Sequence, residues 1–163
     1  MAITEQSLSA YPQEFIAIVM DKYEKMDGIC ASIFNDGYFL VLKRRKIPFI
    51  TNPGKWAFVT GKRKAGERYL DTAYREIEEE TSLKKKELLL ISEPCKVTLC
   101  YKNKKWDNEF FVFVSKSRKI KLNIENASYL WIKADDIIKN KSYLEIFLDK
   151  EAIISILRKN IKI

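Results

Sequence analysis

The 163-residue sequence predicts an α+β fold, a sandwich in which helices pack against a mixed β-sheet. Segments with the pattern of β-strands dominate the middle of the chain, and helical segments are interspersed irregularly among them. This order lacks the regular strand–helix alternation of a doubly wound parallel sheet. The length suits one hydrophobic core, and no stretch rich in proline, glycine or serine marks a linker. We therefore expect a single domain over residues 1–163.

The first half of the chain predicts a hairpin followed by a glycine-containing loop. A candidate helix at about residues 13–25 would form an N-terminal extension over residues 1–27. The segment "GICASIFNDGYFLVLKRRK" then indicates two strands joined at residues 35–37, because Asn-Asp-Gly tolerates the positive φ angles of a tight turn. Another short strand, "KWAFVTG", leads into the loop.

The second half predicts helices and strands in alternation of irregular length. A helix is expected over residues 68–81, and residues 95–116 indicate two strands around a Lys/Asn turn. The segment "ASYLWIKADDII" indicates a strand that passes into a short helix. Apolar residues within 142–160 are spaced to form one face, which predicts an amphipathic closing helix.

The composition restricts the chemistry. The chain has no histidine, which excludes Ser-His-Asp and Cys-His catalysis and the usual zinc sites that contain histidine. Any proton transfer must use Asp, Glu, Lys, Tyr or Cys. Three cysteines without a CxxC pair or an export signal favour a reducing compartment, so we expect a cytoplasmic protein without disulfides. No apolar run approaches the roughly 18 residues of a membrane span, so we expect no membrane partner.

The net charge of +8 favours encounters with polyanions such as nucleotides, RNA or phospholipid surfaces. Solubility is an equally good explanation of the same excess. The charge alone therefore does not select a partner.

Two sets of side chains divide the predicted helix at residues 68–81. The apolar set has the i, i+3, i+4, i+7 spacing of a core-facing helix: Leu70, Ala73, Tyr74 and Ile77. The acidic set, Glu76, Glu79 and Glu80, falls within an arc of about 100°. Three repelling carboxylates on one side become favourable when a divalent cation lies among them, and hard oxygen ligands suit Mg²⁺ or Mn²⁺. The alternative is a solvated acidic face, with Arg75 paired to Glu79 as in ordinary surface helices.

The loop before this helix favours the metal-binding interpretation. Gly61 permits close approach of a ligand to the main chain, and Lys62, Arg63 and Lys64 supply positive charge for phosphate. Loop and helix together would hold phosphates and cations side by side. A basic surface turn is the alternative for the loop alone.

These residues resemble the signature of the Nudix hydrolase family. The signature is a glycine, five residues, a glutamate, seven residues, then Arg-Glu, an aliphatic residue, any residue, Glu-Glu, any residue, a glycine and an aliphatic residue. The matching positions are Gly61, Glu67, Arg75, Glu76, Ile77, Glu79, Glu80, Ser82 and Leu83. Ser82 replaces the family glycine at a predicted helix C-cap, and Val59 and Thr60 replace a Pro-Gly pair. The resemblance also covers "NPGKWAFVTGK" and "YLWIKADDI", and it implies an α/β/α sandwich with a central mixed sheet.

The resemblance implies a metal-dependent pyrophosphohydrolase that cleaves a diphosphate bond in a nucleoside diphosphate linked to another moiety. Catalytic roles fall on Arg75, Glu76 and Glu79, with one glutamate as base and the arginine orienting the carboxylates. The implied cofactor is Mg²⁺, with Mn²⁺ as the alternative. Its implied ligands are Gly61, Glu67, Glu76, Glu79 and Glu80.

Substrate-binding candidates are Lys62, Arg63, Trp56 and Glu109, with Asp107 as the fallback for a later acidic residue. Several aromatic residues have the spacing either to stack a base or, more commonly, to fill the core: Trp56, Phe58, Tyr101, Trp106 and Phe110. An RNA 5′ end is an open alternative to a nucleotide-like small molecule, and the sequence is compatible with a homodimer. The alternative function is a nucleotide- or RNA-binding module on the same fold without hydrolysis.

Overall fold

The computed structural model describes residues 10–14, 27–48, 50–102 and 104–162. The predicted N-terminal helix at about 13–25 lies mainly outside these residues. The strands are β1 (Gly28–Asn35), β2 (Tyr38–Arg44), β3 (Trp56–Ala57), β4 (Val59–Lys62), β5 (Leu88–Leu90), β6 (Cys95–Tyr101), β7 (Lys104–Ser115) and β8 (Asn126–Lys133). The α-helices are α3 (Tyr69–Thr81), α4 (Ala134–Lys139) and α5 (Lys150–Ile161), and the 3₁₀ helices are η1 (Lys85–Glu87) and η2 (Lys141–Leu144).

The strands form one mixed sheet with β1 and β7 at its centre. These two strands run parallel, and the other pairs are antiparallel. Strand β1 changes partner along its length, because Gly28–Ala31 pair with β4 whereas Phe34 and Asn35 pair with β2. The end of β4, where the glycine loop begins, is thereby fixed against the beginning of β1.

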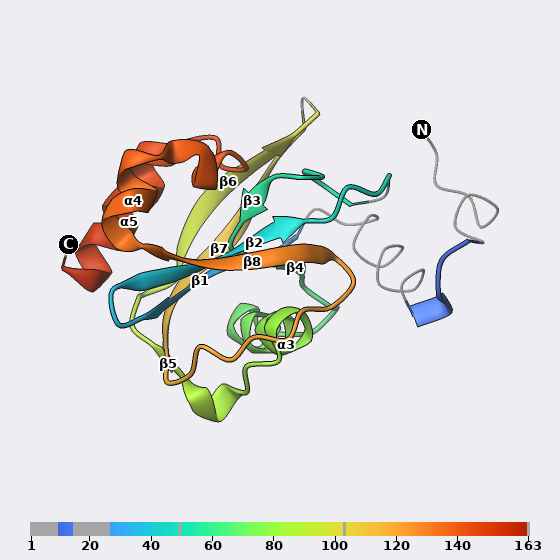
Figure 1. Cartoon of the computed structure of the whole chain (residues 1–163), viewed down its shortest axis with the longest axis horizontal. Coiled ribbons are helices and arrows are strands. Elements are labelled where there is room, and N and C mark those ends of the chain that lie inside the picture. Colours follow the sequence, from blue (N-terminus) through green and yellow to red (C-terminus); the bar gives the residue numbers. More distant parts are fainter. Residues whose placement is uncertain (1–9, 15–26, 49, 103, 163) are drawn as a thin grey trace.

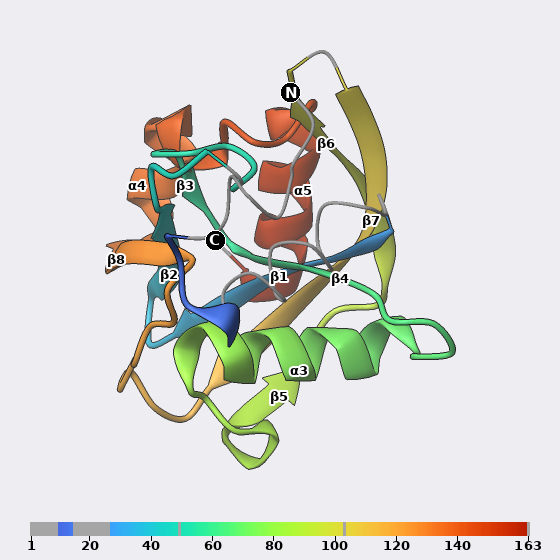
Figure 2. The ribbon, with the colours of Figure 1, turned by 90° about the vertical axis from the view of Figure 1, so that its right-hand side faces the viewer.

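Helices cover both faces of this sheet (Figure 1). On β1, Ile29, Ala31 and Ile33 belong to a hydrophobic cluster with Ile77 of α3. On the other face, alternate residues of β7 such as Phe110 belong to a second cluster with η2, α4 and α5. Figure 2 shows α3 and α5 on opposite sides of the strands. The predicted α/β/α sandwich with a central mixed sheet is confirmed.

The predicted hairpin is also confirmed, with Asp36 at φ 45° and Gly37 at φ 86° between β1 and β2. Strand β5 was not predicted, because three residues are too short to show a pattern. Among the described residues, no helix is long and apolar enough to cross a membrane.

The predicted bounds of the closing helix are wrong at the N-terminal side. Helix α5 begins at Lys150, where the Asp149 carboxylate accepts a hydrogen bond from the amide of Ala152. The apolar residues before α5 lie in η2 and in the turn that follows it, and they are buried there; Leu144 and Phe147 are two of them. Phe147 forms a β-bridge with Leu99, which a helix through this segment would not allow. These residues are apolar because they are buried, so their spacing resembles that of an amphipathic helix although they lie outside α5.

Candidate active site

Gly61, on strand β4, lies directly against helix α3. A Cβ atom at position 61 would lie 1.9 Å from Cδ of Glu76, so glycine is required for the observed approach. Glu76 is one of the carboxylates that the sequence placed at a metal site. The close approach brings its side chain beside the backbone of the glycine loop.

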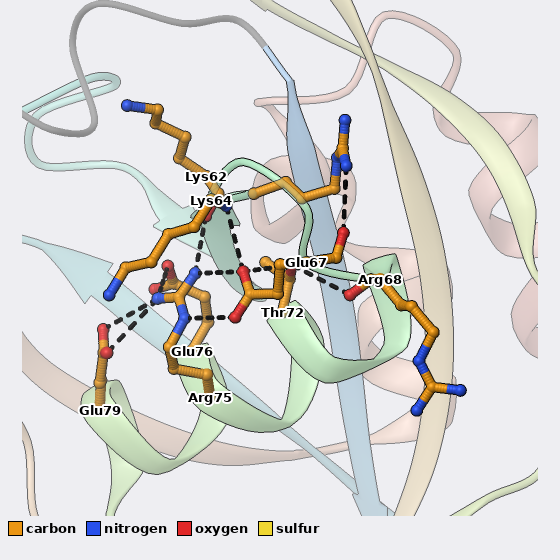
Figure 3. Close-up of polar contacts among 9 residues, drawn as sticks. Lys62, Lys64, Glu67, Arg68, Thr72, Arg75, Glu76 and Glu79 are labelled. Atoms are coloured by element: carbon orange, nitrogen blue, oxygen red, sulfur yellow. Dashed lines mark hydrogen bonds and ion pairs between the residues drawn. The ribbon is translucent and has the colours of Figure 1, made fainter.

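The Arg75 guanidinium lies between three carboxylates (Figure 3). Its Nε and Nη2 donate to the two oxygens of Glu67 at 2.9 and 3.0 Å. Its Nη1 donates to Oε1 of Glu76 at 2.7 Å and lies 3.4 Å from both carboxylate oxygens of Glu79. Nη2 also donates to the carbonyl oxygen of Lys62 at 2.8 Å, which ties α3 to the end of β4. Arg75 thus contacts all three carboxylates, and its predicted role in orienting them remains a prediction.

The contacts of Glu67 and Arg75 determine the protonation states of these two side chains. Hydrogen bonds from Arg75 are the main cause that lowers the pKa of Glu67 to about 2, against burial, which acts in the opposite direction. Thr72 Oγ1 and the Lys64 amide donate to the same carboxylate at 2.7 and 3.1 Å. Burial acts to lower the pKa of Arg75, but its bonds to Glu67 and Glu76 outweigh that effect and raise it. Both groups are charged at neutral pH.

The three glutamates proposed as metal ligands lie in different environments. The exposed fraction is 1% for Glu76 and 0% for Glu80, whereas the Glu79 side chain is 42% exposed. Oε2 of Glu80 accepts a hydrogen bond of 2.9 Å from Nδ2 of Asn126, at the start of β8. Within the described part of the chain, no three His, Cys, Asp or Glu side chains are grouped so as to hold a metal ion. The metal-binding roles remain predictions.

The donor set nevertheless fits a hard divalent cation. Glu76 and Glu79 both approach the Arg75 guanidinium, and the Glu76 carboxylate lies directly against the backbone of Gly61. Carboxylate and carbonyl oxygens are the ligands that Mg²⁺ and Mn²⁺ prefer.

Two of the basic residues of the loop, Lys62 and Arg63, are held by other parts of the protein, whereas Lys64 is exposed. Lys62 is largely buried, and its carbonyl accepts from Arg75. Arg63 forms an ion pair with Asp27, the residue before β1, with Nη2 and Oδ2 2.8 Å apart. The phenol of Tyr69 donates to the other oxygen of Asp27 at 2.9 Å. Asp27 and Tyr69 were not singled out from the sequence, because they stand at positions that the signature leaves undefined.

The aromatic candidates separate into core and partly exposed residues. Phe58 and Phe110 are buried in the cluster beneath α5. Trp56 is partly buried, with its ring centroid 5.9 Å from that of Tyr143 and 5.6 Å from the Lys43 ammonium. Tyr101 and Trp106 are partly buried on β6 and β7. Trp56 packs against the cluster beneath α5, and its substrate-binding role remains a prediction.

Glu109 lies on the α3 side of the sheet. It pairs with Ile29 of β1, which in turn pairs with Gly61, so Glu109 and Gly61 lie in one row across three strands. Side chains alternate along β7, which places Glu109 on the face of its neighbour Phe111, a member of the α3 cluster. Asp107, the fallback, is exposed and accepts from Thr98 at 2.7 Å.

The departures from the signature have local structural explanations. Ser82 is the C-cap of α3 with φ 66° and ψ 6°, the left-handed conformation in which glycine is favoured. Val59 and Thr60 belong to β4 and pair with Ala31 and Cys30 of β1. The residues before Gly61 are therefore strand residues here.

The sandwich architecture defines a Nudix fold. The glycine loop leads into a helix whose glutamates contact one arginine, as in the Nudix signature. Residues 24–150 match the family model described as NUDIX domain. The chain belongs to the Nudix hydrolase family.

Relatives within this family include nucleoside triphosphatase NudI of Escherichia coli. It is 30% identical over 122 residues, which cover 68% of this chain and 83% of the relative. Among solved structures, the MutT protein from Methanosarcina mazei has a TM-score of 0.65 at 24% identity, covering 83% of this chain and 95% of that one. An Ap4A hydrolase binary complex from C. elegans has a TM-score of 0.61 at 23% identity, covering 82% and 91%. At these identities the two structures establish the fold alone.

Proposed function

We propose that the chain is a metal-dependent pyrophosphohydrolase that cleaves a diphosphate bond in a nucleoside diphosphate linked to another moiety. The observation that carries this proposal is the Arg75 cluster, in which one guanidinium holds Glu67, Glu76 and Glu79 beside Gly61. A family member without hydrolysis would have no need to keep these repelling carboxylates closely spaced.

A divalent cation, Mg²⁺ or Mn²⁺, would be held by Glu76, Glu79 and Glu80 with help from Glu67 and the Gly61 backbone. When bound, it would neutralise phosphate oxygens and lower the pKa of bound water. Arg75 orients the carboxylates through charge-assisted hydrogen bonds and has no need to touch the substrate. Either Glu76 or Glu79 would accept the proton of the attacking water.

The substrate class is supported by the relatives rather than by a pocket in this chain. NudI is named a nucleoside triphosphatase, and the C. elegans protein is named an Ap4A hydrolase. A nucleotide bearing a phosphoanhydride is common to both names. Trp56 would contact the base and Lys62 a phosphate, while Glu109 would add an acidic group from β7.

Turnover of a defined panel tests the proposal. Nucleoside triphosphates, dinucleoside polyphosphates, nucleotide sugars and 5′-triphosphorylated RNA are each incubated with Mg²⁺ or Mn²⁺, and release of phosphate, pyrophosphate or nucleoside monophosphate is measured. We expect turnover of at least one nucleotide, and Glu79→Gln should lower kcat at least about tenfold. Glu78→Gln is the matched control, because Glu78 pairs with Lys84 on the exposed surface of the same helix.

The alternative function, binding without hydrolysis, predicts a different pattern. A binding module would show no turnover with any member of the panel, together with tight nucleotide or RNA binding that Glu79→Gln leaves unchanged. That pattern would refute the hydrolase proposal.

A further inference from the structure

We propose that Arg63 is a positioning residue that fixes the glycine loop through Asp27 and Tyr69, and that it is not a phosphate ligand. This inference rests on the proposed hydrolase function, because its kinetic consequences concern that reaction. It changes the role that the sequence suggested for Arg63. The three residues are called the Asp27 cluster below.

The Asp27 cluster uses both oxygens of one carboxylate. Nε and Nη2 of Arg63 lie 2.9 and 2.8 Å from Oδ2 of Asp27, and the Tyr69 hydroxyl donates to Oδ1 at 2.9 Å. The Arg63 guanidinium carbon is 4.8 Å from the centroid of the Tyr69 ring. The Arg63 amide also donates to the Asp27 carbonyl at 2.9 Å. Main chain and side chain of Arg63 are thus held by the same residue.

These contacts connect three segments that the sequence separates. Asp27 immediately precedes β1, Arg63 immediately follows β4, and Tyr69 is the first residue of α3. Nη1 of Arg63 donates to the carbonyl oxygen of Glu67 at 3.0 Å, so the far end of the loop is held as well. The two ends of the loop, at Arg63 and at Glu67, are thereby held together beside the start of β1.

The Glu67 backbone connects the Asp27 cluster to the candidate active site. The Glu67 carbonyl accepts a hydrogen bond from Arg63, and the Glu67 carboxylate accepts one from Arg75. Arg75 also donates to Glu76. A displacement of the loop would therefore move the carboxylate that orients Arg75. An error of about 1 Å in such a constellation can cost about 10²-fold in rate.

The electrostatic state of Arg63 argues against phosphate binding. Its charge is already paired with that of Asp27, with Nη2 and Oδ2 2.8 Å apart. A phosphate would therefore compete for Arg63 with a carboxylate that is already held by Tyr69. The planar fork and ring stacking of this geometry are properties of arginine that lysine lacks.

Two variants of Arg63 separate the roles by kinetics. If Arg63 fixes the loop, Arg63→Lys should lower kcat about tenfold, nearly as much as Arg63→Ala, with KM changed less than about threefold. If Arg63 binds phosphate, the lysine would retain most of the activity as a point charge, and alanine would raise KM. The second result would overturn the proposal.

Asp27→Asn gives an independent test on the other partner. We expect it to lower kcat to the level of Arg63→Ala, and the Asp27→Asn/Arg63→Ala double variant to be no worse than either single variant. A lower KM in Asp27→Asn would instead show that the freed Arg63 attracts phosphate. Arg68→Ala is the matched control, because Arg68 forms an exposed pair with Asp71 at the edge of the same loop. It should leave kcat unchanged.

Amide hydrogen exchange tests the Asp27 cluster without any turnover. Exchange at Glu67, whose amide donates to the Lys64 carbonyl within the loop, should become at least about tenfold faster in Asp27→Asn and stay unchanged in Arg68→Ala. If the wild type turns over nothing but Asp27→Asn accelerates exchange, the hydrolase proposal fails and the loop role stands. If the wild type is active and Asp27→Asn matches it in rate and exchange, the loop role fails alone.

Discussion

At the scale of single residues, Gly61 is the position where adding one methyl group should have the largest effect on stability and activity. Gly61→Ala places a Cβ 1.9 Å from Cδ of Glu76, so the side chain or the strand must move. We expect the free energy of unfolding to fall by about 1–3 kcal/mol and kcat to fall at least about tenfold. Urea denaturation and initial rates measure the two effects.

The double variant Gly61→Ala/Glu76→Ala provides the control for that steric argument. Shortening Glu76 removes the atoms that the new Cβ would meet, so stability should return to that of Glu76→Ala alone, while activity stays low. Equal destabilisation by Gly61→Ala in both backgrounds would contradict a clash with Glu76.

Glu67 predicts a dependence of stability on pH. Its pKa is about 2 in the folded protein against an ordinary value of 4.5. A carboxylate with a lowered folded pKa contributes stability that is complete above the unfolded pKa and is lost as the pH falls towards the folded one. Wild type should therefore lose more stability than Glu67→Gln between pH 5 and pH 2, because over this range the unfolded chain takes up a proton at Glu67 and the folded protein does so only in part. Parallel urea midpoints for the two proteins over this range would contradict it.

At the scale of elements, the end of α3 offers a test of the Ser82 substitution. Ser82 has a φ of 66°, and its hydroxyl donates to the Lys121 carbonyl at 3.0 Å. Glycine avoids the steric cost of this conformation, whereas alanine keeps the cost and loses the hydrogen bond. Ser82→Gly should exceed Ser82→Ala in unfolding free energy by about 1 kcal/mol, as measured by chemical denaturation. Equal stability of the two variants would show that the cap is unstrained.

The elements also show which structural features depend on neighbouring residues in the sequence and which depend on distant ones. The α3 helix and the hairpin at residues 35–37 depend on spacings of a few residues, and they could be predicted. The contact of Glu80 with Asn126 joins residues 46 apart, and no pattern near either one indicates it. The start of α5 depends on the Asp149 cap and on burial of Phe147 against Leu99, which is a tertiary contact. The sequence therefore specified the helix and its charges, but not what each carboxylate contacts.

At the scale of the whole molecule, we propose that the chain is a single domain. Strand β1 contributes Ile29 to the cluster beneath α3 and Cys30 to the cluster beneath α5. The two faces should therefore unfold together. Ile77→Ala and Leu157→Ala, on opposite faces, should each cost about 2–5 kcal/mol and shift the same transition, seen alike by fluorescence and circular dichroism. Two separable transitions in either variant would refute a single cooperative unit.

The parallel pair at the centre of the sheet has a consequence for the order of folding. Strands β1 and β7 pair residues that are 80 apart, such as Gly28 and Asn108. Closing so long a segment is slow compared with forming the hairpins β1–β2 and β6–β7, whose contacts are local. The entire segment from Gly61 to Leu83 lies inside that closure. Catalytic competence should therefore be acquired late in folding, after most of the secondary structure has formed.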